Sequence, residues 1–291
     1  MDLEWNGGYT KKAHEYFNEI IEIGATRLND RLQVVDGFHE LLCPVVTRKL
    51  SDIVTDLTSI TEEELKDGAS FPLAVLRLKQ WIGSQPAVLL TWSTTDLLVL
   101  IENCRYFLHT EHIPFMEYYA DAQAYCQQRL GTGSSQQLGL SRACELLHLS
   151  EEGMDLHRAQ DDSVMTALVL TRVFEPESFA ACVKKADEAF YGRLTFKTTY
   201  LHSLDDPRVK RSWFRFACEA CGGRLRTTGE WQYRNRGFVA DMKCRSCGRQ
   251  YVARVQAKLK YDGVAVKRKL REKTEPAEQG NSPAAEITGQ E

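Results

Sequence analysis

Apolar and polar positions along the first 175 residues follow two periods, one typical of strands and one typical of helices. Short apolar runs predict strands at residues 19–28, 33–42 and 87–92. A Gly/Ser loop is expected at residues 131–137. Apolar residues three and four positions apart predict helices at residues 50–67, 71–82, 96–107, 138–149 and 159–174. Strands that alternate with helices indicate an α/β fold for residues 1–175.

The pattern changes beyond residue 175. Residues 176–190 have the spacing of a further helix, and residues 191–209 form a polar connection. Residues 210–266 are rich in β-type residues, with strands expected near residues 224–233, 238–243 and 250–261. Residues 267–291 begin with a basic cluster and end in Pro, Gly and Ser, so we expect a disordered tail. The predicted segments are therefore 1–175, 176–209, 210–266 and 267–291.

The length of 291 residues allows two domains. No apolar run is long enough to cross a bilayer, and no signal peptide is found, so we expect a cytoplasmic protein without a membrane partner. Five cysteines lie in apolar surroundings and are expected to be buried thiols of a reducing compartment, namely Cys43, Cys104, Cys126, Cys144 and Cys182.

Charge is distributed unevenly along the chain. Residues 208–273 hold 19 Lys and Arg against 5 Asp and Glu, whereas the rest of the chain holds 18 and 35. An acidic body with a charge of -17 is thus joined to a basic module with a charge of +14. The body suits bound cations, and the basic module suits a polyanionic partner.

Two acidic residues open the chain in M-D-L-E-W-N. Alternate residues of a strand share one face, so Asp2 and Glu4 would project to the same side, about 7 Å apart along the backbone. Two carboxylates at a strand end can reach one metal cluster. Taken alone, the pair is more typical of a charged chain start exposed to solvent.

Three further residues can join this pair. Asp96 follows the run A-V-L-L-T-W, at the carboxyl end of a strand where ligands gather, although a helix cap is the commoner use of such an aspartate. His157 and Asp162 are about 140° apart around a regular helix, so they meet only if His157 precedes the helix that carries Asp162. Asp161 competes for the ligand role, and a surface histidine beside helix-start acids is the alternative.

The ordered set is more specific than its parts. Four segments resemble the motifs of DnaQ-like (DEDDh) 3′–5′ exonucleases over residues 1–175: D-L-E, the strand E-I-I-E-I-G-A, the aspartate of W-S-T-T-D, and H-R-A-Q-D-D, which fits H-x-A-x-x-D. The stretch L-S-D-I-V-T-D-L-T-S-I-T is similar to a substrate-side segment of the subgroup with KapD-like proteins and histone-mRNA exonucleases.

The resemblance implies an RNase H-like fold with a mixed five-stranded sheet flanked by helices. It also implies that His157 is the general base, which takes a proton from an attacking water. Carboxylate oxygens suit hard cations, and two ions would serve a phosphodiester hydrolysis. The ligands of the two Mg²⁺ or Mn²⁺ ions would be Asp2, Glu4, Asp96 and Asp162.

The first strand departs from the family pattern. Several apolar residues precede the D-x-E pair in the family, whereas only Met1 does so here. We therefore expect a first strand that is cut short, with an ammonium group one residue from a metal ligand. We also expect either that the natural protein starts further upstream or that the metal site is weakened.

Four more cysteines form two C-x-x-C pairs with 22 residues between them. Thiolates with this spacing are typical of a closed tetrahedral zinc site, and the glycines after each pair help the chain to wrap an ion. Disulfides and a redox C-x-x-C are alternatives that a cytosolic setting and the paired spacing disfavour. We predict a small β zinc ribbon with one structural Zn²⁺ held by Cys218, Cys221, Cys244 and Cys247.

Basic and aromatic residues are interleaved within the predicted ribbon. Arginines can grip phosphates, and exposed rings can stack on unpaired bases. The alternative is that the rings fill a small core while the charges are solvated, and we expect some rings in each role. The candidate contacts are Arg224, Arg226, Trp231, Tyr233, Arg234, Arg236, Arg249 and Arg254.

Together these features predict a divalent-metal-dependent 3′–5′ exonuclease acting on single-stranded RNA or DNA ends. A non-catalytic nucleic-acid-binding or regulatory adaptor on a nuclease fold is the alternative. A metal-dependent phosphatase for small nucleotides would fit the same ligands but would leave the basic ribbon unexplained. The sequence does not separate RNA from DNA, because the 2′-hydroxyl is read by local contacts.

Overall fold

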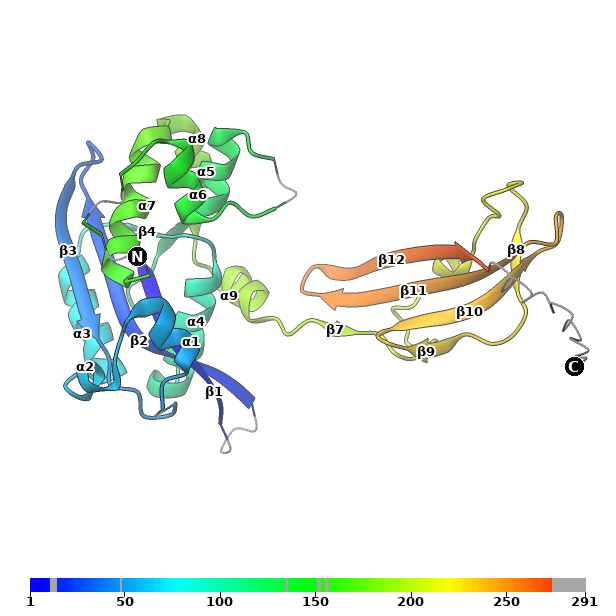
Figure 1. Cartoon of the computed structure of the whole chain (residues 1–291), viewed down its shortest axis with the longest axis horizontal. Helices are drawn as coiled ribbons and strands as arrows, with labels where there is room; N and C mark the ends of the chain where they lie inside the picture. The colour runs from blue at the N-terminus through cyan, green and yellow to red at the C-terminus, as the bar shows by residue number, and fades with distance from the viewer. Residues whose placement is uncertain (11–14, 48, 134–135, 151–152, 155–156, 274–291) are drawn as a thin grey trace, which may run out of the picture. The chain divides into compact units, whose positions relative to one another are not determined.

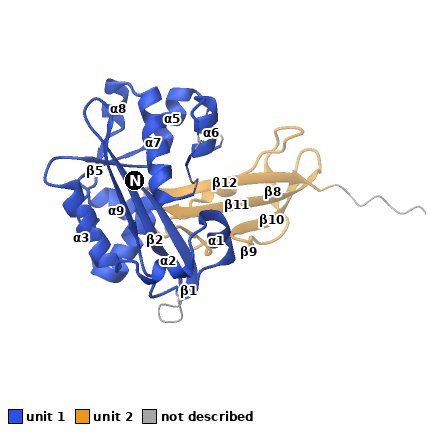
Figure 2. Ribbon diagram, turned by 60° about the vertical axis from the view of Figure 1, so that its left-hand side comes forward, with its two compact units in different colours: residues 1–195 blue, residues 196–291 orange. Residues whose placement is uncertain are grey.

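The computed structural model describes residues 1–10, 15–47, 49–133, 136–150, 153–154 and 157–273. The chain divides into two compact units, Met1–Thr195 and Phe196–Glu291, which Figure 2 shows in different colours. We call them unit 1 and unit 2 and describe each by itself.

The first sheet of unit 1 is antiparallel (Figure 1). It consists of β1 (Asp2–Thr10), β2 (Glu15–Leu28) and β3 (Val34–Leu41), in that order. The middle strand β2 is buried throughout residues 19–25. A strand buried on both faces has no polar side to alternate with, which explains its nearly continuous apolar sequence.

The second sheet of unit 1 is mixed. β4 (Val88–Thr91) and β5 (Tyr118–Asp121) are parallel, and β6 (Lys184–Lys185) pairs antiparallel with β5. The predicted single five-stranded sheet is therefore wrong, because the described strands of unit 1 form two three-stranded sheets. The two sheets are joined by the Met1 ammonium, which donates to the Leu90 carbonyl at 2.8 Å. A cavity of about 590 Å³ lies between residues 25–28 of β2 and residues 88–90 of β4.

The first strand extends well beyond the D-x-E pair. β1 has nine residues, because its pairing with β2 continues from Asp2 to Thr10. A register shift between Glu4 and Trp5 does not end the ladder. β1 begins at Asp2, so only Met1 precedes the D-x-E pair, as expected, and the length of the strand comes from residues that follow the pair.

Helices cover both faces of the first sheet. In chain order the helical segments of unit 1 are α1 (Asp52–Thr58), α2 (Glu62–Lys66), α3 (Phe71–Ile82), α4 (Thr95–Asn103), the π-helix η1 (Cys104–Leu108), α5 (Ala122–Leu130), α6 (Leu140–Leu146), α7 (Ala159–Val173), α8 (Pro176–Cys182) and α9 (Glu188–Thr195). Ile23 of β2 packs in a core with α3 and α4, whereas Gly24 lies against the start of α7. No helix among those that the structure describes has the length and apolar character to cross a membrane.

Two predicted helices are divided in the structure. The helix expected at 50–67 is split into α1 and α2, because Ser59 ends α1 with a left-handed backbone and Thr61 starts α2 in a capping box with Glu64. The helix expected at 176–190 is split around β6 into α8 and α9. Phe190 and Tyr191 of α9 are buried in the core of unit 1. The helix predicted at 71–82 is confirmed.

The five scattered cysteines belong to unit 1. Cys104, Cys126 and Cys144 are buried, and Cys43 and Cys182 are half-buried. Burial raises the pKa of the Cys104 and Cys126 thiols to about 12, so these two groups stay protonated and unreactive.

Unit 2 is an antiparallel sheet with the strand order β12-β11-β10-β8, in which β7 pairs with β11 and β9 with β10. Its elements are β7 (Thr199–Tyr200), the 3-10 helix η2 (Arg211–Phe214), β8 (Leu225–Thr227), β9 (Gln232–Arg234), β10 (Gly237–Cys244), β11 (Gln250–Lys260) and β12 (Gly263–Glu272). The disordered tail predicted from residue 267 is wrong as far as residue 272, because β12 pairs with β11 over that length. Residues 274–291 of the predicted tail lie outside the described residues.

Candidate active site and cysteine cluster

β1 presents two acidic side chains to the face of the sheet that α7 covers. Asp2 lies opposite Gly24, and Glu4 lies opposite Glu22. Leu3, between them, points to the other face and is buried in the core with α3 and α4. Because directly opposed residues share a face, Asp2 and Glu4 point to the side on which Gly24 meets α7.

Asp96 reaches the same strand from a helix. β4 ends at Thr91 and α4 begins at Thr95, so Asp96 lies in the first turn of α4. Its side chain is buried, and its Oδ1 accepts a hydrogen bond from the backbone N–H of Leu3 at 3.2 Å. This bond holds the Asp96 carboxylate against the strand that carries the D-x-E pair.

The start of α7 supplies the remaining two residues. His157 lies in the turn before α7 with a left-handed backbone, φ 66°, and Ala159 is the first residue of the helix. Asp162 lies in the first turn of α7, as the spacing from His157 required. Asp161 and Asp162 compete for the ligand role. Asp162 borders the same cavity as His157, whereas Asp161 is not among the described residues that line this cavity.

All five candidate residues line one cavity of about 450 Å³. One carboxylate oxygen from each of Asp2, Glu4 and Asp162 lies within 4.8 Å of the others, which is close enough for shared metal ions. Asp96 and His157 border the same space. The structure thus brings together residues that are up to 160 positions apart in the sequence, from Asp2 to Asp162.

The rest of the cavity wall is largely apolar. α1 contributes Ile53 and Leu57, residues that are 78% and 49% exposed. Trp5, Trp92 and Leu140 line it as well. α1 comes from the segment that sequence analysis compared with a substrate-side element. The cavity therefore joins a cluster of carboxylates to an apolar surface.

Burial and crowding disfavour the charged forms of these carboxylates. Burial, followed by the neighbouring acids, raises the pKa of Glu4 to about 8. Burial raises the pKa of Asp96 to about 6, and burial with nearby like charges raises the pKa of Asp2 and Asp162. The cluster is therefore short of positive charge, and a bound cation would lower these pKa values.

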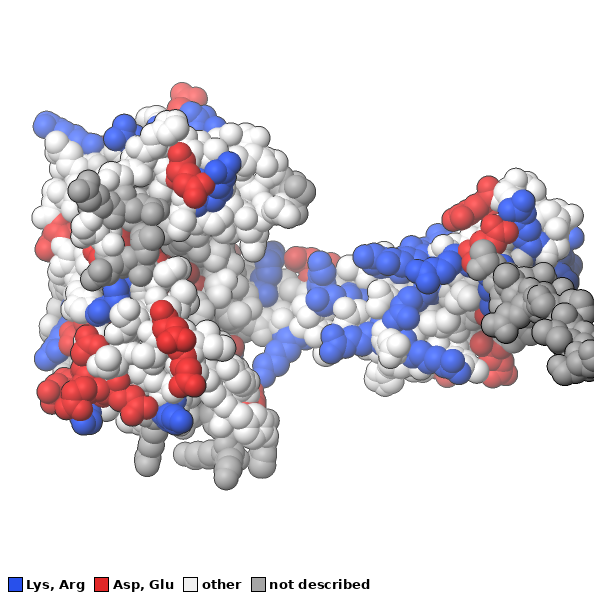
Figure 3. Space-filling view, viewed as in Figure 1, with Lys and Arg blue, Asp and Glu red and all other residues white. Residues whose placement is uncertain are grey.

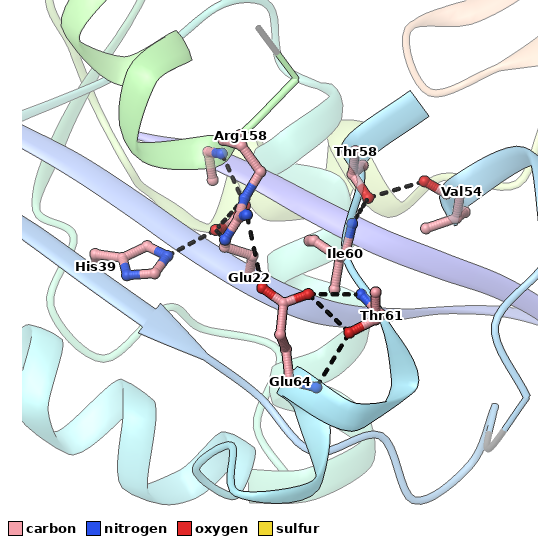
Figure 4. A network of polar contacts seen from close by, with 9 residues as sticks. Glu22, His39, Val54, Thr58, Ile60, Thr61, Glu64 and Arg158 are labelled. Atoms are coloured by element: carbon pink, nitrogen blue, oxygen red, sulfur yellow. Dashed lines mark hydrogen bonds and ion pairs between the residues drawn. The ribbon is translucent and has the colours of Figure 1, made fainter. Parts of the chain in front are cut away.

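A polar network that sequence analysis did not identify fixes the start of α7 (Figure 4). Glu22 is fully buried, and its Oε1 accepts hydrogen bonds from Arg158 Nε at 2.9 Å and His39 Nε2 at 2.6 Å. Its Oε2 accepts from the backbone N–H of Ala159 at 2.9 Å. Burial alone would raise the pKa of Glu22, but these hydrogen bonds outweigh it and lower the pKa. Arg158 also lies 4.0 Å from Glu64 of α2.

The sequence did contain a signal for this network. Glu19 and Glu22 interrupt the apolar run of β2, and a charge in a doubly buried strand needs partners. Glu19 finds them in the backbone N–H groups of residues 45–47 and the Thr47 hydroxyl, at 2.6–3.1 Å. β2 and the start of α7 also pack closely beside the Glu22 network. A Cβ atom at Gly24 would lie 2.0 Å from the Ala159 carbonyl carbon, so this position has no room for a side chain.

The four patterned cysteines come together in unit 2. Their sulfur atoms all lie within 4.8 Å of one another. Cys218 and Cys247 are 3.5 Å apart, as are Cys221 and Cys244. Four sulfurs at this separation are the donor set of a tetrahedral zinc site.

Each C-x-x-C pair is closed by a local turn. Gly222 donates its N–H to the Cys218 carbonyl at 2.9 Å, and Gly248 donates to the Cys244 carbonyl at 3.0 Å. Both glycines have left-handed backbones, with φ of 70° and 77°. A hydrogen bond with the Tyr251 hydroxyl at 3.1 Å lowers the pKa of the Cys218 thiol to about 6, which favours the thiolate that a metal needs.

The candidate contact residues of unit 2 differ in their surroundings. Trp231 packs on Phe214, with ring centroids 4.8 Å apart, and borders the core, so it fits the alternative in which rings fill that core. Tyr233 packs on Phe238 but is 40% exposed. The side chain of Arg249 forms an ion pair at 3.1 Å with Glu272. The other candidates are exposed or half-exposed, namely Arg224, Arg226, Arg234, Arg236 and Arg254.

Comparison with known sequences gives matches to nucleases. Residues 1–170 match the family model described as exonuclease (RNase T). The 3′-5′ exoribonuclease 1 of Rattus norvegicus is 24% identical over 190 residues, which cover 61% of this chain and 52% of the rat protein. The Homo sapiens protein of that name is 24% identical over 172 residues, covering 55% and 48%. The chain thus spans about half the length of the curated relatives it matches.

Comparison with solved structures gives a shared fold. The nuclease domain of 3′hExo, a DEDDh family member bound to rAMP, has a TM-score of 0.52 and 21% identity, covering 64% of this chain and 94% of that domain. A 3′-exonuclease solved for its 3′-end-specific recognition of histone mRNA stem-loop has a TM-score of 0.52 and 19% identity, covering 64% and 89%.

Proposed function

This chain belongs to the exonuclease family, and we propose that unit 1 removes nucleotides from the 3′ ends of single-stranded nucleic acid. The observation that carries the proposal is the convergence of five side chains on one cavity. They are the family's motif residues by position, and they come from β1, α4 and the start of α7. The five residues are Asp2, Glu4, Asp96, His157 and Asp162.

The carboxylates are proposed to hold two Mg²⁺ or Mn²⁺ ions. The donor set fits, because hard cations prefer carboxylate oxygens and oxygens of Asp2, Glu4 and Asp162 already lie within 4.8 Å of one another. When bound, two such ions activate a water molecule and stabilise the leaving oxygen. The raised pKa values of Glu4 and Asp96 also fit, since crowded carboxylates favour a cation as their partner.

His157 is proposed as the general base. Its side chain borders the cavity and is exposed, so it can take a proton from the attacking water and pass it to solvent. The water oxygen bonds to phosphorus as the bond from phosphorus to the 3′ oxygen breaks, and the leaving 3′ oxygen takes up a proton from solvent. The products are a nucleoside 5′-phosphate and a strand with a new 3′-hydroxyl.

The apolar wall is proposed to receive the terminal base. Ile53 and Leu57 of α1 expose apolar side chains at the cavity, and Trp92 borders it from another element. A base that lies against these groups has left its pairing partner. We therefore infer a preference for unpaired 3′ ends.

In unit 2 we infer one structural zinc ion, held by the four cysteines, with no ligand position left for chemistry. The exposed arginines at 224, 226, 234 and 236 and the half-exposed Arg254 are proposed to contact the phosphates of the same substrate class, single-stranded RNA or DNA. This contact would raise the affinity of the chain for a strand without taking part in hydrolysis.

The direct test is a time course on 5′-labelled single strands of RNA and DNA in Mg²⁺ or Mn²⁺. We expect products that shorten from the 3′ end, with nucleoside 5′-phosphates released and with a chelator stopping the reaction. Duplexes with blunt ends should be shortened more slowly. A protein that binds the strands and releases no mononucleotide in either metal would be an adaptor, and the proposal would be wrong.

A further inference from the structure

The sheet of unit 2 has two faces of different character. Successive side chains of a strand alternate between faces, and in β11 the buried positions are 251, 253, 255 and 257. The first three of these residues belong to the core that contains Phe216 and Met242. The residues at even positions of β11, with those directly opposite them on β10 and β12, form the other face, which we call the outer face.

The outer face is strongly cationic, and Figure 3 shows Lys and Arg side chains gathered over unit 2. Asp241, opposite Val252, is an acid on this face, and its carboxylate lies 2.8 Å from Lys273 Nζ. The cations placed on the outer face by the strand registers are Arg226, Lys243, Arg254, Lys258, Lys260, Lys267, Lys269 and Arg271.

The strand register places like charges opposite each other. Arg254 of β11 lies directly opposite Lys269 of β12, and its guanidinium donates to the carbonyls of Arg234 and Asn235. Lys267 and Arg271 lie two positions to either side on β12 and point to the same face. Like charges directly opposite each other destabilise a sheet, so these four cations lower the stability of the free unit. A bound polyanion would remove that repulsion.

The aromatic rings of unit 2 do not cover this face. Trp231 and Tyr233 pack toward Phe214 and Phe238, on the core side. Tyr200 lies at one end of the outer face, opposite Lys258, whose Nζ is 5.9 Å from the ring centroid. The face therefore offers charge along its length but little surface on which bases could stack.

We propose that the outer face of unit 2 binds the sugar–phosphate backbone of a single strand without reading its bases, and that β12 supplies the main contacts. Lys267, Lys269 and Arg271 are spaced at about 7 Å along β12, because alternate residues of a strand are that far apart. Successive phosphates of an extended single strand have a similar separation. The proposal rests on the proposed function for its ligand, a single-stranded nucleic acid.

The test measures binding of the full chain to a single strand as a function of salt. The strands are an oligouridylate and an abasic sugar–phosphate strand of equal length, both capped at the 3′ end against hydrolysis, without added Mg²⁺ or Mn²⁺. For the variant Lys267→Gln/Lys269→Gln/Arg271→Gln we expect an affinity about tenfold lower at low salt. The slope of log K against log salt should fall by about 2, since each phosphate contact of a single strand contributes ~0.7.

A matched control removes three exposed lysines of unit 1, as Lys79→Gln/Lys184→Gln/Lys185→Gln, with the same change in net charge. Its affinity and salt slope should stay close to those of the parent chain. If the triple β12 variant melts early by circular dichroism, the single reversal Lys269→Glu replaces it and should still weaken binding. Wild-type affinity in both β12 variants would overturn the proposal.

Three other results would also overturn it. The abasic strand binding about tenfold more weakly than the oligouridylate would mean that bases are read. Tighter binding of a duplex would exclude the single strand as the ligand. Binding to vesicles that contain phosphatidylserine, with no binding to either strand, would make the face a membrane contact.

The result of these binding measurements can be distinguished from a test of the proposed exonuclease activity. Release of mononucleotides by the parent chain in Mg²⁺ or Mn²⁺ tests the proposed function, whereas binding of the capped strands without these metals tests the outer face. If the parent chain releases none, the proposed function fails while the binding data still decide the role of the outer face.

Discussion

The carboxylate cluster of unit 1 and the cysteine cluster of unit 2 are assembled in different ways. Asp2, Asp96 and Asp162 come from three elements far apart in the sequence and meet only because α4 and α7 pack on β1. The cysteines come from two short turns whose hydrogen bonds lie within each C-x-x-C loop. The first cluster therefore depends on tertiary packing, and the second depends mainly on local sequence.

The two clusters also differ in what they leave open. The carboxylates border a cavity of about 450 Å³ with an apolar wall, whereas the four sulfurs already face one another within 4.8 Å. An open set of ligands suits a substrate, and a closed set suits structure. Loss of metal should thus stop chemistry in unit 1 and loosen the fold of unit 2.

The largest effect is expected at the cysteines. Cys221→Ser should release the metal and unfold unit 2, because structural zinc contributes roughly 10–16 kcal/mol of binding free energy in small domains. Metal analysis should show the loss of one zinc ion per chain, and limited proteolysis should cut unit 2 while unit 1 survives. The control is Cys182→Ser, a half-buried cysteine of unit 1, which should keep the metal. Full zinc content in Cys221→Ser would contradict the assignment.

The next effect is expected at the base and its neighbour. His157→Ala should lower the hydrolysis rate by about 10²–10⁴-fold, the usual contribution of a general base, and Asp162→Asn should be at least as severe. Asp161→Asn makes the same charge change one residue away and should leave the rate nearly unchanged. Rates at saturating substrate decide the comparison. Equal losses in Asp161→Asn and Asp162→Asn would show that the wrong aspartate has been assigned.

A smaller effect should follow from loosening the support of α7. Arg158→Lys keeps the charge but loses the paired hydrogen bonds to Glu22, which hold the turn that carries His157. We expect a 10- to 100-fold loss of activity or metal affinity, as is usual for groups that orient ligands. The concentration of Mg²⁺ at half-maximal rate should rise while KM for the strand stays constant. Arg142→Lys, in an exposed ion pair with Glu145, is the control and should behave like the parent.

The smallest effect is the pH dependence of stability without divalent cations. The pKa of Glu4 rises from 4.5 in the unfolded chain to about 8 in the folded one. Between these values the folded state holds the proton and the unfolded state does not, so this group's contribution to stability falls as pH rises through that window. Thermal melts at pH 5 and pH 8 should show this loss, and added Mg²⁺ should restore more stability at pH 8. The substitution Glu4→Gln removes this carboxyl group, so the difference in melting temperature between pH 5 and pH 8 should become smaller.

Much of this architecture was predictable from the sequence, and the failures have physical causes. The D-L-E, W-S-T-T-D and H-R-A-Q-D-D motifs indicated the exonuclease family, which the match over residues 1–170 confirms. The five residues that share the cavity could be named only through the order of these motifs and the resemblance that it carries, because each motif alone fits a commoner structural role. The Glu22–Arg158 network was missed because Glu22 interrupts the apolar run of β2 without indicating which distant residue will be its partner.

The errors at the end of the described chain have a similar origin. Residues 267–272 of β12 were expected to be disordered because their Lys and Arg side chains resemble a solvated tail. Their alternation with Val264, Val266 and Leu270 is a strand pattern, but it becomes informative only when β11 offers an edge to pair with. The five-stranded sheet failed for a different reason, since β1 pairs with β2 and touches β4 through the Met1 ammonium.

β12 also has a consequence for solubility. It is ten residues long and lies at the edge of its sheet among the described strands, with one row of backbone groups that no described strand pairs. Long sheet edges invite edge-to-edge association of copies, and lysines on such an edge oppose it. The charges of β12 would therefore keep molecules apart at high concentration. Single-stranded nucleic acid that neutralises those charges would be expected to promote condensation of the protein. Turbidity should be greatest where the negative charge of the nucleic acid equals the positive charge of the protein.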